Sequence, residues 1–260
     1  MPSDFVLFVV VGFIAQIVDG ALGMAYGVVS TTFLLGFGVS PAVASACVHS
    51  AEVFTTAASA TSHIANRNVE WRPLAILALA GATGGAIGAF VLTSVDGAMV
   101  RPFVTAYLAG MGLWILSRAF RKRPAEQVVA RRRLLGPLGL VGGFLDSIGG
   151  GGWGPTVTTT LVGTGAAPRK VIGTVNAAEF IVTSATSAAF LAAILSGHWS
   201  EAVGVQQHGA AIGGLIVGGV LAAPLAGIAV RKISPQTLTV LVGLLVAGLA
   251  SFQTWQILAG

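Results

Sequence analysis

Acidic residues stand beside glycine-rich stretches at two places in an otherwise apolar chain. Asp19 precedes the stretch GALGMAYG, and Asp146 opens the stretch DSIGGGGWG, which holds five glycines. A carboxylate is costly inside a bilayer, whereas glycine interrupts a helix and lets a ligand approach the backbone. Half-helices that begin at such breaks direct N–H groups and a positive dipole end at a ligand, which favours an anion. Both aspartates could instead cap the half-helices, and residue type alone does not decide between these roles.

A second pair of acids, Glu52 and Glu179, lies inside long apolar segments. Polar residues around them recur at helical spacing and so share one helix face. Such a face belongs in the bundle interior or beside a water-filled cavity, although its small members also serve helix–helix hydrogen bonding. The two stripes are Ser45, His49, Glu52, Thr56, Ser59 and His63, and Asn176, Glu179, Thr183 and Thr186. We predict that Asp19, Glu52, Asp146 and Glu179 carry the coupling protons.

The substrate is expected to contact the two glycine breaks and the two polar stripes. Tyr26 and Trp153 would wall the site or simply pack, and Thr31 and Thr158 would donate hydroxyls to the substrate or bond to their own helices. The predicted substrate-binding residues are Gly23, Tyr26, Gly27, Thr31, His49, Gly149, Gly150, Gly151, Gly152, Trp153, Thr158 and Asn176.

Enzymatic motifs are missing from the sequence. The four-glycine run lacks the Lys and Ser or Thr that a phosphate loop requires, and the sequence HSAE lacks the second histidine of a zinc-protease motif. The single cysteine, Cys47, excludes an intrachain disulfide. We therefore expect no catalytic activity, no metal and no cofactor.

The composition indicates a membrane protein. Hydrophobic residues make up 55% of the 260 residues and charged residues only 9%, and the mean hydropathy is +0.87. A soluble domain carries about 25% charged residues. Long runs rich in Ala, Leu and Gly favour helices over a β-barrel. The net charge of +5 is spread between apolar segments and does not indicate nucleic-acid binding. The N-terminus has no basic region typical of a signal peptide.

The chain is an internal duplication. A shift of 127 residues, without a gap, aligns Asp19 with Asp146, Glu52 with Glu179 and Pro41 with Pro168. Internal repeats are typical of secondary transporters. Each half is predicted to hold a broken region (5–36 and 136–163), a helix after a proline (41–64 and 168–196) and two further helices (72–93 and 101–119; 202–223 and 235–258). The predicted divisions are repeat 1 (1–119), a basic cytoplasmic linker (120–134) and repeat 2 (135–260).

The basic residues decide between two topologies. If each broken region crossed the membrane once, the 14 Lys and Arg residues would divide nine inside to five outside. If each broken region is a hairpin that returns to its starting side, thirteen lie inside and only Arg101 lies outside. The positive-inside rule favours the hairpins. The predicted fold is therefore an all-α integral membrane protein with two inverted repeats, each a glycine-broken helical hairpin followed by three transmembrane helices, and with both termini outside.

One segment of each half combines a glycine-broken start, a turn that ends in proline and a helix with an acid. The segments are VDGALGMAYGVVSTTFLLGFGVSPAVASACVHSAE and GFLDSIGGGGWGPTVTTTLVGTGAAPRKVIGTVNAAEF. Through them the chain resembles, over nearly its whole length, the sulfite exporter TauE/SafE family. The first half matches less cleanly, because it lacks the glycine run and has His49 where the second half has Asn176. The resemblance implies a transporter of anions, mostly sulfur-containing ones such as sulfite or sulfonates.

The expected function is proton-coupled export of a small sulfur-containing anion by alternating access, in a multi-pass protein of the cell membrane. The alternative is a passive channel for a small anion or a neutral sulfur species. The expected partners are the anionic substrate, protons, the lipid bilayer and a second copy in a homodimer. Glycine-rich faces in GATGGAIGAF and GAAIGGLIVGG permit close helix packing, either within one protomer or across a dimer.

Overall fold

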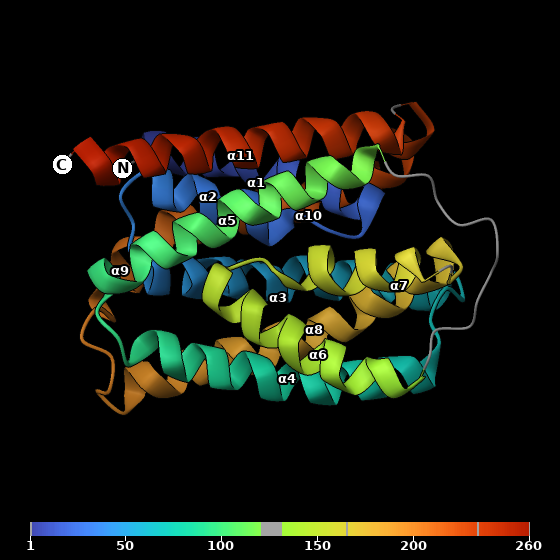
Figure 1. Ribbon diagram of the computed structural model, residues 1–260, viewed down its shortest axis with the longest axis horizontal. Coiled ribbons are helices and arrows are strands. Elements are labelled where there is room, and N and C mark those ends of the chain that lie inside the picture. The colour runs from blue at the N-terminus through green and yellow to red at the C-terminus, as the bar shows by residue number, and fades with distance from the viewer. Residues whose placement is uncertain (1, 121–131, 165, 233, 260) are drawn as a thin grey trace.

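The structure, a computed structural model, describes residues 2–120, 132–164, 166–232 and 234–259, and every regular element in them is helical (Figure 1). In chain order the elements are α1 (Pro2–Leu22), α2 (Tyr26–Gly36), α3 (Pro41–Ala65), α4 (Trp71–Thr93), α5 (Gly97–Ala119), α6 (Arg132–Gly149), the π-helix η1 (Gly154–Thr158), α7 (Thr159–Gly163), α8 (Pro168–Leu195), α9 (Val203–Gln207), α10 (Gly209–Lys232) and α11 (Pro235–Ala259).

The helices break where the glycines and acids predict. α1 and α2 are separated by residues 23–25, and α6 and η1 by residues 150–153. Gly23 and Gly150, which the repeat aligns, have φ angles of 68° and 63°. Residues with side chains rarely adopt this left-handed conformation, so glycine is required at both turns. Pro41 and Pro168 begin α3 and α8, as expected for prolines in a first helical turn.

Two predicted boundaries differ from the structure. The predicted linker 120–134 overlaps α6, which begins at Arg132, and its residues 121–131 lie outside the described part of the chain. The single helix predicted over 202–223 is wrong. The chain there forms the short α9, leaves helical geometry at His208 (φ −97°, ψ 17°), and starts α10 at Gly209. Glycines at 204 and 209 weaken a continuous helix at this point.

The bundle has two distinct ends. In Figure 1 both termini lie at the left, which we call the terminal end, whereas α5 ends and α6 begins at the right, the linker end. At each end, hydrogen bonds join turns that are far apart in the sequence. The Ser40 hydroxyl donates to the Glu201 carboxylate at the terminal end, and Lys170 Nζ donates to Arg67 O over 2.7 Å at the linker end.

Basic residues gather at the linker end. Of the ten Lys and Arg residues in the described part of the chain, nine belong to turns or helix ends there, and only Arg101, near the start of α5, lies at the terminal end. The basic residues of the described chain are therefore concentrated at one end of the bundle.

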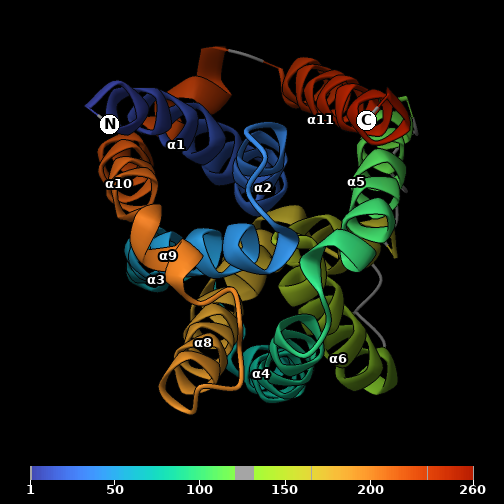
Figure 2. The same ribbon diagram turned by 90° about the vertical axis from the view of Figure 1, so that its left-hand side faces the viewer.

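The first helix of each half packs against a helix of the other half. α1 lies along α10, and α6 lies along α4 (Figure 2). A Cβ atom added to Gly218 of α10 would lie 2.0 Å from Val9 O, and one added to Gly84 of α4 would lie 2.1 Å from Leu140 O. The helix backbones therefore touch, as small residues allow in membrane bundles. The glycine-rich faces in the sequence are used inside the protomer.

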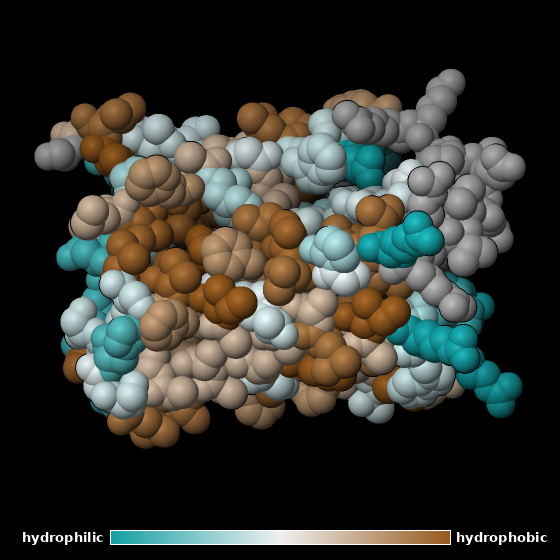
Figure 3. All heavy atoms as spheres, turned by 60° about the horizontal axis from the view of Figure 1, so that its bottom comes forward, coloured by the Kyte–Doolittle hydropathy of each residue, from teal (hydrophilic) through white to brown (hydrophobic). Residues whose placement is uncertain are grey.

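Apolar side chains cover much of the exterior. Figure 3 shows hydrophobic residues across the middle of one face and hydrophilic residues toward the linker end at its right. Large side chains such as Leu79, Phe103 and Leu195 are more than 70% exposed. Within the described residues, α4, α5, α8 and Gln236–Ala259 of α11 are long and apolar enough to cross a membrane. The exterior matches the integral membrane protein that the composition predicts.

Candidate substrate and proton site

The two helix breaks are tied to each other crosswise. The Thr31 hydroxyl of α2 donates to Gly150 O in the second break over 2.6 Å, and the Thr158 hydroxyl of η1 donates to Gly23 O in the first break over 2.9 Å. Thr31 and Thr158 are repeat partners, as are Gly23 and Gly150, so one interaction occurs twice. Both predicted threonines therefore bond to the opposite break rather than to their own helices.

No side chain would fit where the breaks cross. A Cβ atom added to Gly27 would lie 2.5 Å from the Cα of Gly151, and one added to Gly154 would lie 2.6 Å from the Cα of Met24. These two contacts are also repeat partners. Since backbone rather than a flexible side chain is the obstacle, the glycines let two half-helix starts meet inside the bundle.

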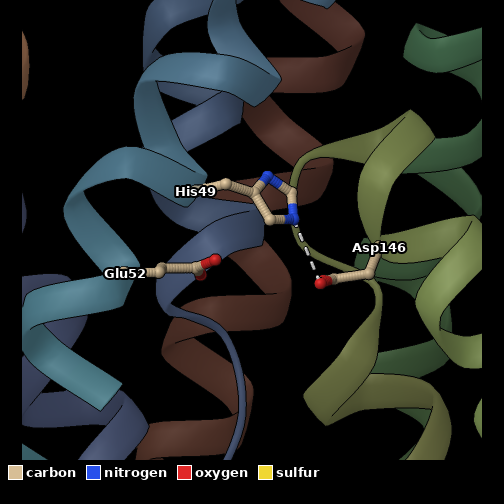
Figure 4. A group of neighbouring side chains, drawn as sticks. All are labelled: His49, Glu52 and Asp146. Atoms are coloured by element: carbon tan, nitrogen blue, oxygen red, sulfur yellow. Dashed lines mark hydrogen bonds and ion pairs between the residues drawn. The ribbon is translucent and has the colours of Figure 1, made fainter. Parts of the chain in front are cut away.

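Asp146 performs two roles at the second break. Its Oδ1 accepts hydrogen bonds from the backbone N–H groups of Gly152 (2.7 Å) and Trp153 (2.9 Å), which makes it the cap of the returning half-helix. Its Oδ2 lies 3.2 Å from His49 Nε2, from α3 (Figure 4). The capping and chemical roles that the sequence leaves open therefore use different oxygens of one carboxyl group.

The contacts of His49 require a proton between it and Asp146. His49 Nδ1 lies 2.8 Å from Ser45 O, and because a carbonyl only accepts, Nδ1 carries a hydrogen. In a neutral imidazole Nε2 would then offer a lone pair to a carboxylate oxygen, which is repulsive. The 3.2 Å contact is favourable only if Nε2 or Oδ2 is also protonated. The pair therefore holds a proton between the two side chains.

Three more acids surround this pair. Asp19, Glu52 and Glu179 are at most 7% exposed, and the four carboxyl groups lie close enough for their charges to act on one another. Asp19 caps α2 less tightly, by accepting from Tyr26 N over 3.4 Å. Glu52 Oε2 has no hydrogen-bond partner among the described residues. Like charges in a buried site cannot all remain ionised without compensation, so protons or another cation must accompany them.

The polar face of α8 differs from that of α3 at the position of His49. Asn176, the repeat partner of His49, donates its Nδ2 to Ser59 Oγ over 3.1 Å, while its Oδ1 has no partner in the described part of the chain. The amide cannot carry a proton as the imidazole can. The structure therefore places the titratable histidine beside the second break only, which agrees with the unequal halves of the sequence.

The two aligned aromatic residues have structural partners. The Tyr26 hydroxyl donates to Leu215 O over 3.0 Å, and the Trp153 indole N–H donates to Val175 O over 3.1 Å. Trp153 is fully buried and also packs against Gly81 of α4. Both residues thus fasten the starts of the returning half-helices to neighbouring helices.

Sequence reasoning missed Tyr107 of α5. Its ring and hydroxyl lie against the second break, since Cβ atoms added to Gly149 and Gly152 would lie 2.1 Å from its Cε1 and 2.3 Å from its hydroxyl oxygen. The hydroxyl is buried and has no hydrogen-bond partner among the described residues. A tyrosine in a predicted apolar helix is a detectable signal, but the sequence gives no reason to place it on this break.

The same cluster has the donor atoms of a cation site. His49, Glu52 and Asp146 each offer one ligand atom, and these atoms lie within 4.8 Å of one another. A histidine held through Nδ1 by a carbonyl is typical of metal ligands. However, the cap occupies one Asp146 oxygen, so the three residues offer few donors for a metal ion. A proton satisfies the His49–Asp146 contact directly.

Comparisons with known proteins agree with the membrane architecture. The family model described as "Sulfite exporter TauE/SafE" matches residues 8–252. A curated protein of Bacillus subtilis (strain 168), "Probable membrane transporter protein YtnM", is 41% identical over 246 residues, which cover 93% of this chain and 79% of the relative. No solved structure matches significantly. The chain is a multi-pass membrane protein and belongs to the sulfite exporter TauE/SafE family.

Proposed function

We propose that the protein is a proton-coupled secondary transporter that exports a small sulfur-containing anion, such as sulfite or an organosulfonate. Its substrate site lies where the two breaks cross, and the four buried acids with His49 carry the coupling protons. The observation that carries the proposal is the His49–Asp146 pair, which shares its carboxyl group with the cap of the second break. A change in protonation there acts directly on the backbone that would hold the anion.

The acids supply a reason for coupling. Half-helix starts attract an anion, but four buried carboxyl groups would repel it if they were ionised. Protons that neutralise these groups therefore strengthen anion binding, and by linkage the bound anion strengthens proton binding. Anion and protons would cross the bundle together, and export would be driven by the outward concentration gradient of the anion.

Alternating access follows from the packing of the bundle. We propose that the two repeats are inverted relative to each other, with the linker end in the cytoplasm. The first helix of each half packs against the other half, α1 on α10 and α6 on α4. One moving unit would therefore contain α1–α3 and α10, and the other would contain α4 and α6–α8. Movement between these units around the crossed breaks would open the site to each side in turn.

The test is transport into proteoliposomes that contain the purified protein. An imposed pH gradient should drive labelled sulfite or ethanesulfonate above its equilibrium concentration, and a protonophore should abolish the accumulation. Equilibration without accumulation under every gradient would support the alternative, a passive channel. Transport of none of these anions would contradict the proposed substrate class.

Treatment with a chelator shows whether protons or a metal ion compensate the charges of the buried acids. EDTA and dialysis should leave transport unchanged if protons compensate the acids. Loss of transport after chelation, with recovery on adding a divalent cation, would show instead that His49, Glu52 and Asp146 hold a metal.

A further inference from the structure

Arg101 is the exception to the charge distribution of the bundle. It is the only Lys or Arg that the described residues place at the terminal end, where the other titratable groups are acids and histidines. The positive-inside rule gives no reason for a basic residue on that side. The local contacts of Arg101 suggest that it binds a ligand.

The guanidinium group of Arg101 is poorly satisfied by the protein. Its Nη2 donates one long hydrogen bond, 3.4 Å, to Leu35 O near the end of α2. Its Nε is buried and has no partner among the described residues, and no described carboxylate lies within ion-pair distance. An arginine offers five donors in a planar fork, and the protein accepts from only one of its nitrogens, so the partly exposed group keeps donors free for a ligand.

The side chain borders a shallow, open hollow at the bundle surface. The hollow has a volume of about 690 Å³ and lies between the 36–38 turn, Arg101 and the last turn of α11, including Trp255 and Gln256. The arginine fork matches the oxygens of a sulfite or sulfonate group. Trp255 offers an apolar wall for an organic substituent, and Gln256 offers an amide donor.

A single helix, α2, runs from the first break to the edge of the hollow. α2 begins at the first break with Tyr26 and ends at Gly36, beside Arg101. Eleven residues of helix span roughly 16 Å. The hollow therefore lies about one helix length from the first break, toward the terminal end.

We propose that Arg101 and the surrounding hollow form an oxyanion-binding vestibule at the terminal end of the protein. It binds the transported anion before entry or after release at that side. The identity of the anion rests on the proposed function, whereas the vestibule itself rests on Arg101 and the hollow. The headgroup phosphate of a lipid has the same chemistry, so the experiment must separate the two sources.

The experiment measures binding of ethanesulfonate and sulfite to the detergent-purified protein by calorimetry. Arg101→Gln should weaken the vestibule component at least tenfold, and Arg101→Lys, which keeps the charge but loses the fork, should weaken it less. Arg72→Gln, at an exposed arginine of the linker end, is the matched control and should bind like the wild type. Melting temperatures without anion verify that the variants fold.

Unchanged anion affinity in folded Arg101→Gln would overturn the proposed vestibule. If this variant also loses co-purified phospholipid, Arg101 binds a lipid headgroup instead of the anion. Transport separates this inference from the proposed function. If the wild type transports the anions, Arg101→Gln should raise KM several-fold with little change in kcat. If the wild type transports neither anion, the proposed function fails while the binding result still decides the vestibule.

Discussion

Asp146 shows how one carboxyl group can link structure to chemistry. One oxygen holds the start of the returning half-helix and the other contacts His49. The sequence predicts that this acid matters, and it offers capping and chemistry as alternatives. It cannot show that both occur together, because His49 lies 97 residues away and reaches the break only in the folded bundle.

Substitutions of Asp146 can separate the two roles. Asp146→Asn keeps an oxygen for the N–H groups of Gly152 and Trp153, so the protein should fold with a nearly unchanged melting temperature but lose its response to a pH gradient. Asp146→Ala also removes the cap, which costs about 1 to 2 kcal/mol of stability. Thermal melting and proteoliposome flux measure the two effects. Gradient-driven accumulation by Asp146→Asn equal to that of the wild type would assign the residue to capping alone.

Tyr107 supplies a second prediction at a single side chain. Tyr107→Phe removes a buried hydroxyl that lacks a partner, so it should leave stability unchanged or raise it by up to about 1 kcal/mol. If the hydroxyl donates to the substrate at the second break, KM should rise several-fold. A KM equal to that of the wild type would limit Tyr107 to packing on Gly149 and Gly152.

The helix breaks are the elements that the sequence predicts best. Glycines, prolines and the 127-residue shift locate both breaks to within a few residues. The crossing of the breaks is not predictable in this way. Thr31 and Thr158 each have a local alternative, a bond to the helix backbone four residues earlier, and only tertiary packing brings the opposite glycine carbonyl within reach.

Removing the crossed hydrogen bonds should loosen both breaks together. Thr31→Val and Thr158→Val keep the side-chain shape, and each should cost about 1 to 2 kcal/mol because a buried carbonyl loses its donor. Both variants should also transport more slowly. Thr61→Val is the matched control, since the Thr61 hydroxyl is exposed and donates to Ala57 O of its own helix. Stability losses no larger than that of the control would show that the crossed bonds do not hold the breaks.

At the scale of the whole molecule, composition and repeat predict an all-helical membrane protein, and the structure agrees. The sequence does not show that the halves interlock. Gly84 and Gly218 look equally suited to a dimer interface, and only the contacts of α4 with α6 and of α10 with α1 assign them to the protomer. The shared packing also means that the moving units need not coincide with the two repeats.

Reporter fusions test the orientation of the bundle. A reporter active only outside the cytoplasm should give a signal at both termini, and a reporter active only in the cytoplasm should give a signal in the linker 120–134. This outcome follows from the hairpins, which leave Arg101 as the only basic residue outside. A cytoplasmic signal from either terminus would contradict the inverted repeats.

The most direct test of proton coupling is to measure proton movement that is driven by the anion gradient alone. Proteoliposomes with a pH-sensitive dye inside and no initial pH gradient receive an inward gradient of sulfite or ethanesulfonate. The wild type should acidify the interior as the anion enters, and Asp146→Asn should not. Anion entry in the wild type with no change in internal pH would contradict proton coupling at the crossed breaks.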